Sequence, residues 1–431
     1  EGPHRAKFMA LSEGSKLELL TAITSLQQYT TNSKKTTSRS RKLFSLMSWR
    51  QQKLCEDAGY LKRLHSIEDA FVRNQHILDS VAQKAVDDYG VVFRDFELLR
   101  SRTNNNASSL NYRVVEAMGH FVRDWRFGGL KEVEPLHNYV KEQLDATIPV
   151  LERKNTCIVL PGSGLGGVSH FVALLKPEFG AVHAVEYSGL MHICNRYMYT
   201  ESVATKSTTE ESINADTIKH KMGTKDDSEV LKDPKLTKSN RSYLPLQNDH
   251  PRSLYPYIHS NSNITRTANQ FRGIDIQTQQ PRPANLSLDH EDFRYYKIPQ
   301  LENFKNVVVV SVFFVDTAEN LMDYLDSIKN LTTPTPRNSI QNGYWINVGP
   351  LKYGSAAQVE PTAQELEQLR SSMGWKDLDS RSCVDKGEIV GYITDHESLW
   401  QGYYGLAKWT SARKENKRKW KVGDEQKKEK I

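Results

Sequence analysis

One short segment constrains the fold of this chain more than any other, a glycine-rich loop between an apolar run and a helix. The apolar run over 156–160 has the length of a strand and leads into Pro161-Gly162-Ser163-Gly164-Leu165-Gly166-Gly167. A helix is predicted over 168–175, and a second strand over 181–185 that ends at Glu186. Strand, glycine loop, helix and strand in this order form the opening unit of a doubly wound α/β sheet.

The loop also indicates what kind of ligand the sheet holds. Glycines let the backbone approach a ligand closely, and the next helix begins with free N–H groups. Gly162, Gly164 and Gly167 match the GxGxxG pattern of dinucleotide-binding proteins, whereas Gly162, Gly164 and Gly166 match the GxGxG pattern of S-adenosylmethionine-dependent methyltransferases. Glu186, about twenty residues further on, is placed to accept hydrogen bonds from the ribose hydroxyls of an adenosine. NAD and S-adenosylmethionine both stay open at this point.

The later part of the chain continues the alternation of strands and helices. The run over 307–315 is almost entirely apolar, as expected of a central strand that is covered on both faces. A helix is predicted over 318–329. Three further segments have strand character: 343–348, 388–393 and 403–410. The predicted fold class is therefore α/β, with a Rossmann-like doubly wound sheet and a helical region before it.

Outside the sheet the sequence divides into segments of different character. Apolar residues recur at helical spacing over 61–99 and 112–125. The stretch 200–245 is too polar to offset its ordering entropy, so we expect a disordered insertion there. The expected organisation is a partly disordered segment 1–60 with a loop over 33–41, a helical region or lid 61–150, an α/β domain 151–413 and a basic tail 414–431.

Charge and cysteine usage exclude several classes of protein. The chain has 58 Lys and Arg against 52 Asp and Glu, and residues 411–431 alone carry +5 of the net +6. A nucleic-acid partner is not expected, because such proteins place their basic residues on the folded domain. No apolar run is long enough for a membrane helix. The four scattered cysteines form no metal or disulfide pattern, which favours a reducing compartment such as the cytoplasm.

Three further positions are candidates for chemistry. Asp316 follows the apolar run at the carboxyl end of the central strand, where ligands bind, although an acid there also suits the N-cap of the next helix. Asp292 and Phe293 suit the amino group and ring of an adenine, or equally a loop acid beside a core phenylalanine. Tyr404, beside Tyr403 in a late strand, is either a stacking partner for a substrate or part of the core.

Taken in order, these segments resemble the carnosine N-methyltransferase family. The resemblance covers roughly residues 64–413 apart from the insertion, and two of its segments are specific, whereas the glycine loop alone is not. The segments are Phe121-Val122-Arg123-Asp124-Trp125, Leu160 to Gly166, Glu186-Tyr187-Ser188, Tyr255-Pro256-Tyr257-Ile258-His259, Asp292-Phe293, and the specific pair Phe313-Phe314-Val315-Asp316-Thr317-Ala318-Glu319-Asn320 and Trp345-Ile346-Asn347-Val348-Gly349-Pro350-Leu351.

The resemblance implies a class I methyltransferase fold with S-adenosylmethionine as cofactor, acting on the imidazole Nδ1 of carnosine, a β-alanyl-histidine dipeptide. It implies cofactor contacts at His120, Arg123, Gly162, Gly164, Gly166, Glu186, Asp292, Phe293 and Val312. The implied catalytic residues are Asp316 and Tyr404, and the implied acceptor site is formed by Asp316, Tyr353, Gly354 and Tyr404. Three positions depart from the family: His120 replaces a Gln, Val312 a Cys, and Gly354 a His that helps to hold the substrate.

Elementary chemistry gives Asp316 a role in such a reaction. A sulfonium methyl group is already activated, so the protein mainly has to align it with the nucleophile. An imidazole has a pKa of about 6.5 and is mostly neutral at pH 7. Its Nδ1 lone pair is free when the proton sits on Nε2. We expect Asp316 to accept that N–H, which fixes the tautomer and stabilises the cation that methylation forms.

Two other functions stay open. The glycine loop and Glu186 also permit an NAD(P)-dependent oxidoreductase, although the sequence has no usefully placed proton-relay motif such as YxxxK. The second alternative is a cofactor-binding protein that has lost its activity and serves as an interaction scaffold. The expected partner is a small molecule, no membrane contact is expected, and a homodimer stays open. We expect the protein in the cytoplasm and also in the nucleus.

Overall fold

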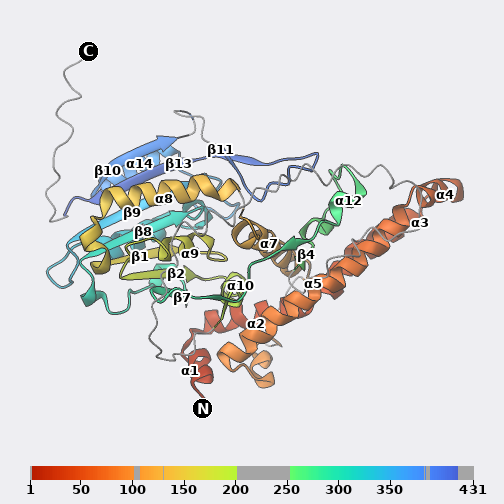
Figure 1. Ribbon diagram of the computed structural model, residues 1–431, viewed down its shortest axis with the longest axis horizontal. Coiled ribbons are helices and arrows are strands. Elements are labelled where there is room, and N and C mark those ends of the chain that lie inside the picture. Colours follow the sequence, from red (N-terminus) through yellow and green to blue (C-terminus); the bar gives the residue numbers. More distant parts are fainter. Residues whose placement is uncertain are drawn as a thin grey trace.

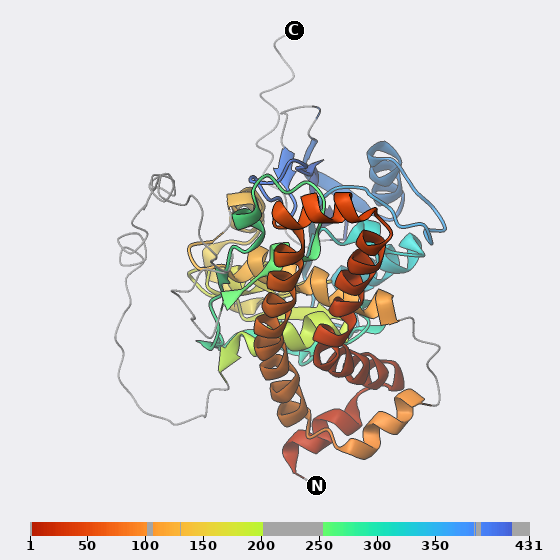
Figure 2. The ribbon, with the colours of Figure 1, turned by 90° about the vertical axis from the view of Figure 1, so that its right-hand side faces the viewer.

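The computed structural model describes residues 2–100, 107–129, 131–200, 253–382, 384 and 389–415. Its centre is a seven-stranded sheet with helices on both faces, and a group of N-terminal helices lies at one end (Figures 1 and 2). The strands of the sheet are β1 (Thr156–Pro161), β2 (Ala181–Glu186), β7 (Leu286–His290), β8 (Asn306–Val312), β9 (Asn342–Gly349), β10 (Trp375–Ser382) and β13 (Ala407–Arg413).

The strand order is β7-β2-β1-β8-β9-β13-β10. The first five strands are parallel, and β13 lies antiparallel between β9 and β10. Numbered along the chain, the order is that of a Rossmann-like sheet in which a last, antiparallel strand has entered between the fifth and sixth. The predicted class I methyltransferase fold is therefore confirmed.

Burial explains why the central strands are so apolar. Every residue of β1 and β9 is buried, as are six of the seven residues of β8. One face packs against α8 (Glu134–Thr147), α9 (Gly167–Ala173) and α10 (Gly189–Tyr197), and the other against α13 (Leu321–Thr332) and α14 (Ala363–Ser372). Parallel strands covered on both faces leave no polar side, so the 307–315 run shows no alternation.

The N-terminal helices share one hydrophobic cluster with the first face of the sheet. They are α1 (Pro3–Ala10), α2 (Glu13–Gln27), α3 (Tyr29–Ser45), α5 (Tyr60–Tyr89), α6 (Glu97–Arg100) and α7 (Ala107–Trp125). Helix α4 (Trp49–Asp57) lies between α3 and α5 in the chain and has no buried residue. A Cβ on Gly189, the first residue of α10, would come within 2.5 Å of the Glu18 carbonyl of α2, so glycine permits this close packing. Figure 1 shows α3, α4 and α5 projecting away from the sheet.

One expectation for the first 60 residues is wrong. Residues 33–41, expected to be a loop, lie inside α3, and Tyr29, Ser33 and Thr37 form its buried stripe at a spacing of four. Two of these side chains find partners on other helices: Asn74 of α5 donates to the Tyr29 hydroxyl, and Asn111 of α7 donates to Ser33 Oγ. Tertiary packing thus overrides a composition of low helix propensity.

The described chain also contains short 3-10 helices, helix α12 (Thr267–Gln270) and three pairs of short strands. The pairs are β3 (Tyr199–Thr200) with β6 (Gln280–Pro281), β4 (Ser253–Leu254) with β5 (Ile274–Asp275), and β11 (Ile389–Gly391) with β12 (Tyr403–Gly405). Nearly all of the insertion expected over 200–245, and most of the tail 414–431, lie outside the described residues. In the part of the chain that is described, no helix is long and apolar enough to cross a membrane.

Candidate active site

The glycine loop joins β1 to α9 through three left-handed residues. Gly162, Gly164 and Gly166 have φ values of 58°, 55° and 86°, whereas Gly167 has no positive φ. These are the three glycines of the GxGxG pattern, and side chains rarely adopt this backbone conformation. A Cβ on Gly162 would lie 2.4 Å from the Phe314 ring, but one on Gly164 would meet nothing within 4 Å. The loop therefore leaves open space beside Gly164.

Glu186 ties this loop to the end of β2. Its two carboxylate oxygens accept hydrogen bonds from the N–H groups of Gly164 and Ser188, both at 2.8 Å. Burial raises the pKa of the Glu186 carboxyl, and these backbone donors oppose the shift. Each carboxylate oxygen can accept a further bond, so the acid can still receive ribose hydroxyls.

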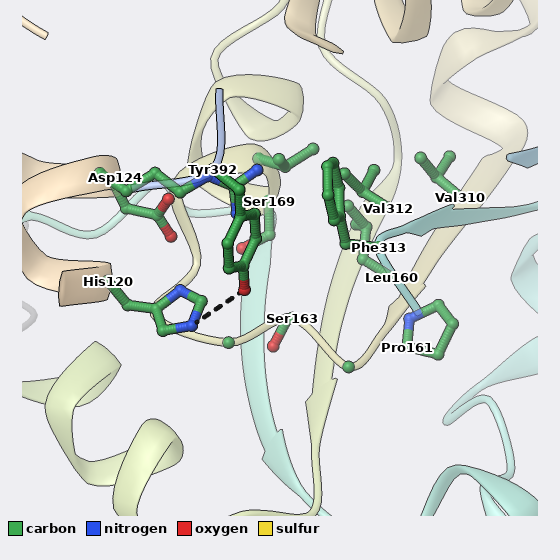
Figure 3. A pocket seen from close by; sticks show the side chains of 14 residues that line it. His120, Asp124, Leu160, Pro161, Ser163, Ser169, Val310, Val312, Phe313 and Tyr392 are labelled. Carbon is green, nitrogen blue, oxygen red and sulfur yellow. Dashed lines mark hydrogen bonds between the residues drawn. The ribbon is translucent and has the colours of Figure 1, made fainter. Parts of the chain in front are cut away.

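A cavity lies between the loop, the end of β8 and helix α7 (Figure 3). Five of the residues predicted to contact a cofactor line it: His120, Arg123, Gly162, Gly164 and Val312. Gly166 is not among the lining residues and faces the Asn195 side chain of α10 instead. The structure thus brings α7 of the helical region and the sheet together around one space.

Arg123 is the buried cation of this cavity. It is 8% exposed, and its guanidinium lies 5.0 Å from the ring centroid of Phe313 and 4.9 Å from that of Tyr392. Its Nε has no hydrogen-bond partner among the described residues, and the same holds for the Oγ of Ser163. A buried donor without an acceptor is costly, so this end of the cavity suits an anionic group.

His120 is held by an aromatic residue that comes from far along the chain. Its Nε2 lies 3.3 Å from the Tyr392 hydroxyl, and this bond is drawn in Figure 3. Burial, reinforced by the positive charge of Arg123, lowers the pKa of His120 to about 4. His120 is therefore neutral at pH 7, and Arg123 is the charged member of the pair.

Asp292 and Phe293 follow β7 and are not among the residues that line the cavity. Asp292 is bound by Arg294, whose guanidinium donates to both carboxylate oxygens. The Phe293 ring is buried and meets the Phe314 ring edge to face at 5.5 Å. Tyr324 stacks on Phe314 at 4.4 Å; burial raises the pKa of its phenol, and the charges of Asp292 and Glu186 add to this. These contacts place Phe293 against Phe314, next to Gly162, and pair Asp292 with Arg294.

Asp316 is buried just beyond the carboxyl end of β8. It does not cap the next helix, because α13 begins only at Leu321 and is capped by Asn320. Instead its Oδ2 accepts the backbone N–H of Lys352 at 2.9 Å. Burial raises the pKa of Asp316, while the Lys352 N–H opposes the shift. The structure thus excludes the capping role, and the ligand-binding role of Asp316 stays a prediction.

Lys352 also connects Asp316 to Tyr404. Its Nζ donates to the Tyr404 hydroxyl at 3.2 Å. The Tyr404 ring lies edge-on to Phe313 and Tyr392, with centroid distances of 6.1 and 5.9 Å. Lys352 thus links Asp316, which binds its backbone N–H, to Tyr404, whose ring contacts Phe313 and Tyr392 of the cavity wall.

The last two predicted acceptor residues, Tyr353 and Gly354, differ in their contacts with the rest of the fold. The Tyr353 hydroxyl donates to the Pro361 carbonyl at 2.7 Å, which commits it to the fold. Gly354 has open space around it, since a Cβ there would meet nothing within 4 Å. No structural constraint at this position demands a glycine.

The groups gathered at this site fit S-adenosylmethionine. Arg123 offers a cation to the carboxylate of its amino-acid end, the space beside Gly164 admits close backbone contact, and Glu186 is placed for the ribose. Four contributors were missed by sequence reasoning: Phe313, Phe314, Lys352 and Tyr392. Phe313 has a φ of 51°, and nothing in the sequence marked this turn or the return of Tyr392 to the site.

A sequence model of the carnosine N-methyltransferase family matches residues 100–227 and 242–415, which is more than half of the chain. The chain belongs to the carnosine N-methyltransferase family. This assigns it to the methyltransferases, with S-adenosylmethionine as the cofactor of the class.

Individual relatives are distant. The chain is 30% identical over 302 residues to an uncharacterized protein of Saccharomyces cerevisiae, covering 69% of this chain but only 54% of that one. It is 25% identical over 399 residues to the carnosine N-methyltransferase of Schizosaccharomyces pombe, covering 86% and 89%. Human N-acetylserotonin methyltransferase, solved with S-adenosylmethionine, is 9% identical with a TM-score of 0.31, covering 81% and 70%. The fold assignment accordingly rests on the strand order.

Proposed function

We propose that the protein transfers the methyl group of S-adenosylmethionine to the imidazole Nδ1 of carnosine or a related histidine-containing dipeptide. The observation that carries this is the buried Asp316 carboxylate just beyond the carboxyl end of β8, on the same edge as the glycine loop, which Lys352 links to Tyr404. Family membership supports the same class of reaction.

Each residue has a distinct task in this reaction. S-adenosylmethionine supplies an activated methyl group, so no metal or strong base is required of the protein. Asp316 accepts the Nε2–H of the acceptor, which leaves the Nδ1 lone pair free to attack and offsets the positive charge that forms on the ring. The Tyr404 ring, which lies edge-on to Phe313, offers a flat face for an imidazole. Arg123 holds the carboxylate end of the cofactor, and Glu186 holds its ribose.

The identity of the dipeptide rests on the acceptor side. Gly354 offers no side chain where the family offers a histidine, so one contact to carnosine is missing. We therefore expect one of two outcomes. Either the protein methylates carnosine with a lower affinity than its relatives have, or it prefers a related imidazole as acceptor. The substrate range decides between them.

A methyl-transfer screen with labelled S-adenosylmethionine tests the proposal. Carnosine, free histidine, other histidyl dipeptides and a matched alanyl dipeptide as control would be compared. We expect transfer to an imidazole acceptor and none to the control. Binding of S-adenosylhomocysteine without transfer to any imidazole would favour the inactive scaffold, and calorimetric binding of NAD in its place would favour an oxidoreductase.

We also propose the cytoplasm and nucleus as its location, which imaging of the tagged protein tests.

A further inference from the structure

A buried carboxylate outside the predicted site is bound to the wall of the cavity. Glu132 follows α7, and its side chain is 7% exposed. Oε1 accepts the Ile393 N–H at 2.6 Å, and Oε2 accepts the Thr394 N–H at 3.2 Å. Successive N–H groups around a left-handed residue form a concavity that suits an anion. We call residues 392–394 the strap.

The strap is strained at its centre. Ile393 has a φ of 52°, which is unusual for a β-branched residue, and its side chain presses on Gly119 of α7, where a Cβ would come within 3.2 Å. Such a conformation persists only where the surroundings enforce it. The hydrogen bonds that Ile393 and Thr394 donate to Glu132 do so, and they hold the strap against α7.

Both ends of the strap contact residues of the predicted site or their chain neighbours. Tyr392 stacks on Phe313, lies over Arg123 and bonds to His120. Thr394 donates from its hydroxyl to the Gly402 carbonyl, next to the strand that carries Tyr404. Glu132 itself lies 3.9 Å from the unpartnered Nε of Arg123, within reach of its charge but beyond a hydrogen bond.

We propose that Glu132 is a positioning residue, whose carboxylate fixes the strap on α7 and so holds Tyr392 and Arg123 in place for the cofactor. This rests on the proposed function. Glu132 touches neither cofactor nor acceptor and acts through the strap. In Glu132→Gln the amide nitrogen would face a backbone N–H, so one bond is lost and the negative charge is gone.

Calorimetry with S-adenosylhomocysteine tests this without an acceptor. Glu132→Gln should raise the Kd roughly 10- to 100-fold, the effect of a lost charged hydrogen bond. Glu132→Asp, which keeps the charge but is one methylene shorter, should fold and also weaken binding. The control Glu134→Gln removes a neighbouring exposed acid and should leave the Kd unchanged. A folded Glu132→Gln or Glu132→Asp with the wild-type Kd overturns the proposal.

A double-mutant cycle separates positioning from general destabilisation. In an Arg123→Lys background, Glu132→Gln should add much less to the Kd than it does in the wild type, because both act at the same end of the cofactor. Fully additive effects would show that Glu132 does not act through Arg123. If the wild-type chain bound no S-adenosylhomocysteine, the proposed function would fall first, and this inference with it.

Discussion

At the scale of the residue, the placement of Asp316 is the most consequential result. Asp316→Asn keeps the shape and the Lys352 bond but presents an amide instead of a charge. We expect cofactor affinity to persist and turnover to fall by roughly 100-fold or more, since tautomer control and charge stabilisation are both lost. Steady-state kinetics measure the turnover and calorimetry measures the cofactor affinity, both on one preparation. Unchanged turnover with full cofactor binding would remove Asp316 from the mechanism.

Gly354 allows a gain of function to be tested. Because the position is open and its φ is not left-handed, Gly354→His should fold like the wild type and restore the contact that the family has. We expect the KM for carnosine to fall by roughly tenfold, the worth of one good hydrogen bond. Gly2→His, at a similarly open but remote position, is the control. An unaltered KM would mean that the acceptor does not reach this position.

At the scale of the element, the glycine loop separates two kinds of constraint. Gly162→Ala and Gly164→Ala share a backbone cost of roughly 1–2 kcal/mol, because both residues are left-handed. Only Gly162→Ala also drives a methyl into Phe314, which adds about 1–3 kcal/mol of overpacking. We expect Gly162→Ala to lower Tm more, and Gly164→Ala to weaken S-adenosylhomocysteine binding while staying folded. Equal losses of Tm would contradict this.

The sequence predicts those elements whose signal is local. The apolar run of β8 and the glycines around Gly164 are visible without a partner, so the strand, the loop and the fold class follow from them. Helix α3 is not predictable in this way, because its polar stripe is helical only when packed on α5 and α7. The position of Tyr392 is not predictable for the same reason. Its contact with Arg123 joins residues more than two hundred positions apart in the sequence and depends on the strap.

At the scale of the whole molecule, buried histidines couple folding to pH. Burial lowers the pKa of His120, His259 and His290 to about 4, and that of His192 well below its ordinary value. Between pH 6.5 and 4 the unfolded chain binds protons that the folded chain does not, so stability is full above pH 6.5 and falls below it. Each histidine contributes at most roughly 1.4 kcal/mol per pH unit.

Urea unfolding at pH 7.5, 6.5, 5.5 and 4.5 measures this loss. The free energy of unfolding should be nearly flat between the first two values and then fall steeply. His65→Gln, which removes a histidine whose side chain is 72% exposed, should leave the slope as it is. A free energy that stays constant down to pH 4.5 would contradict the expected net loss.

The position of β13 has a consequence for the order in which the protein is made. β9 and β10 both leave the ribosome before the strand that separates them. Until β13 arrives, β9 is an unpaired edge of eight residues that are all buried in the finished sheet. Such edges invite wrong pairing, so a nascent chain that stalls between β10 and β13 is the form most in need of a chaperone.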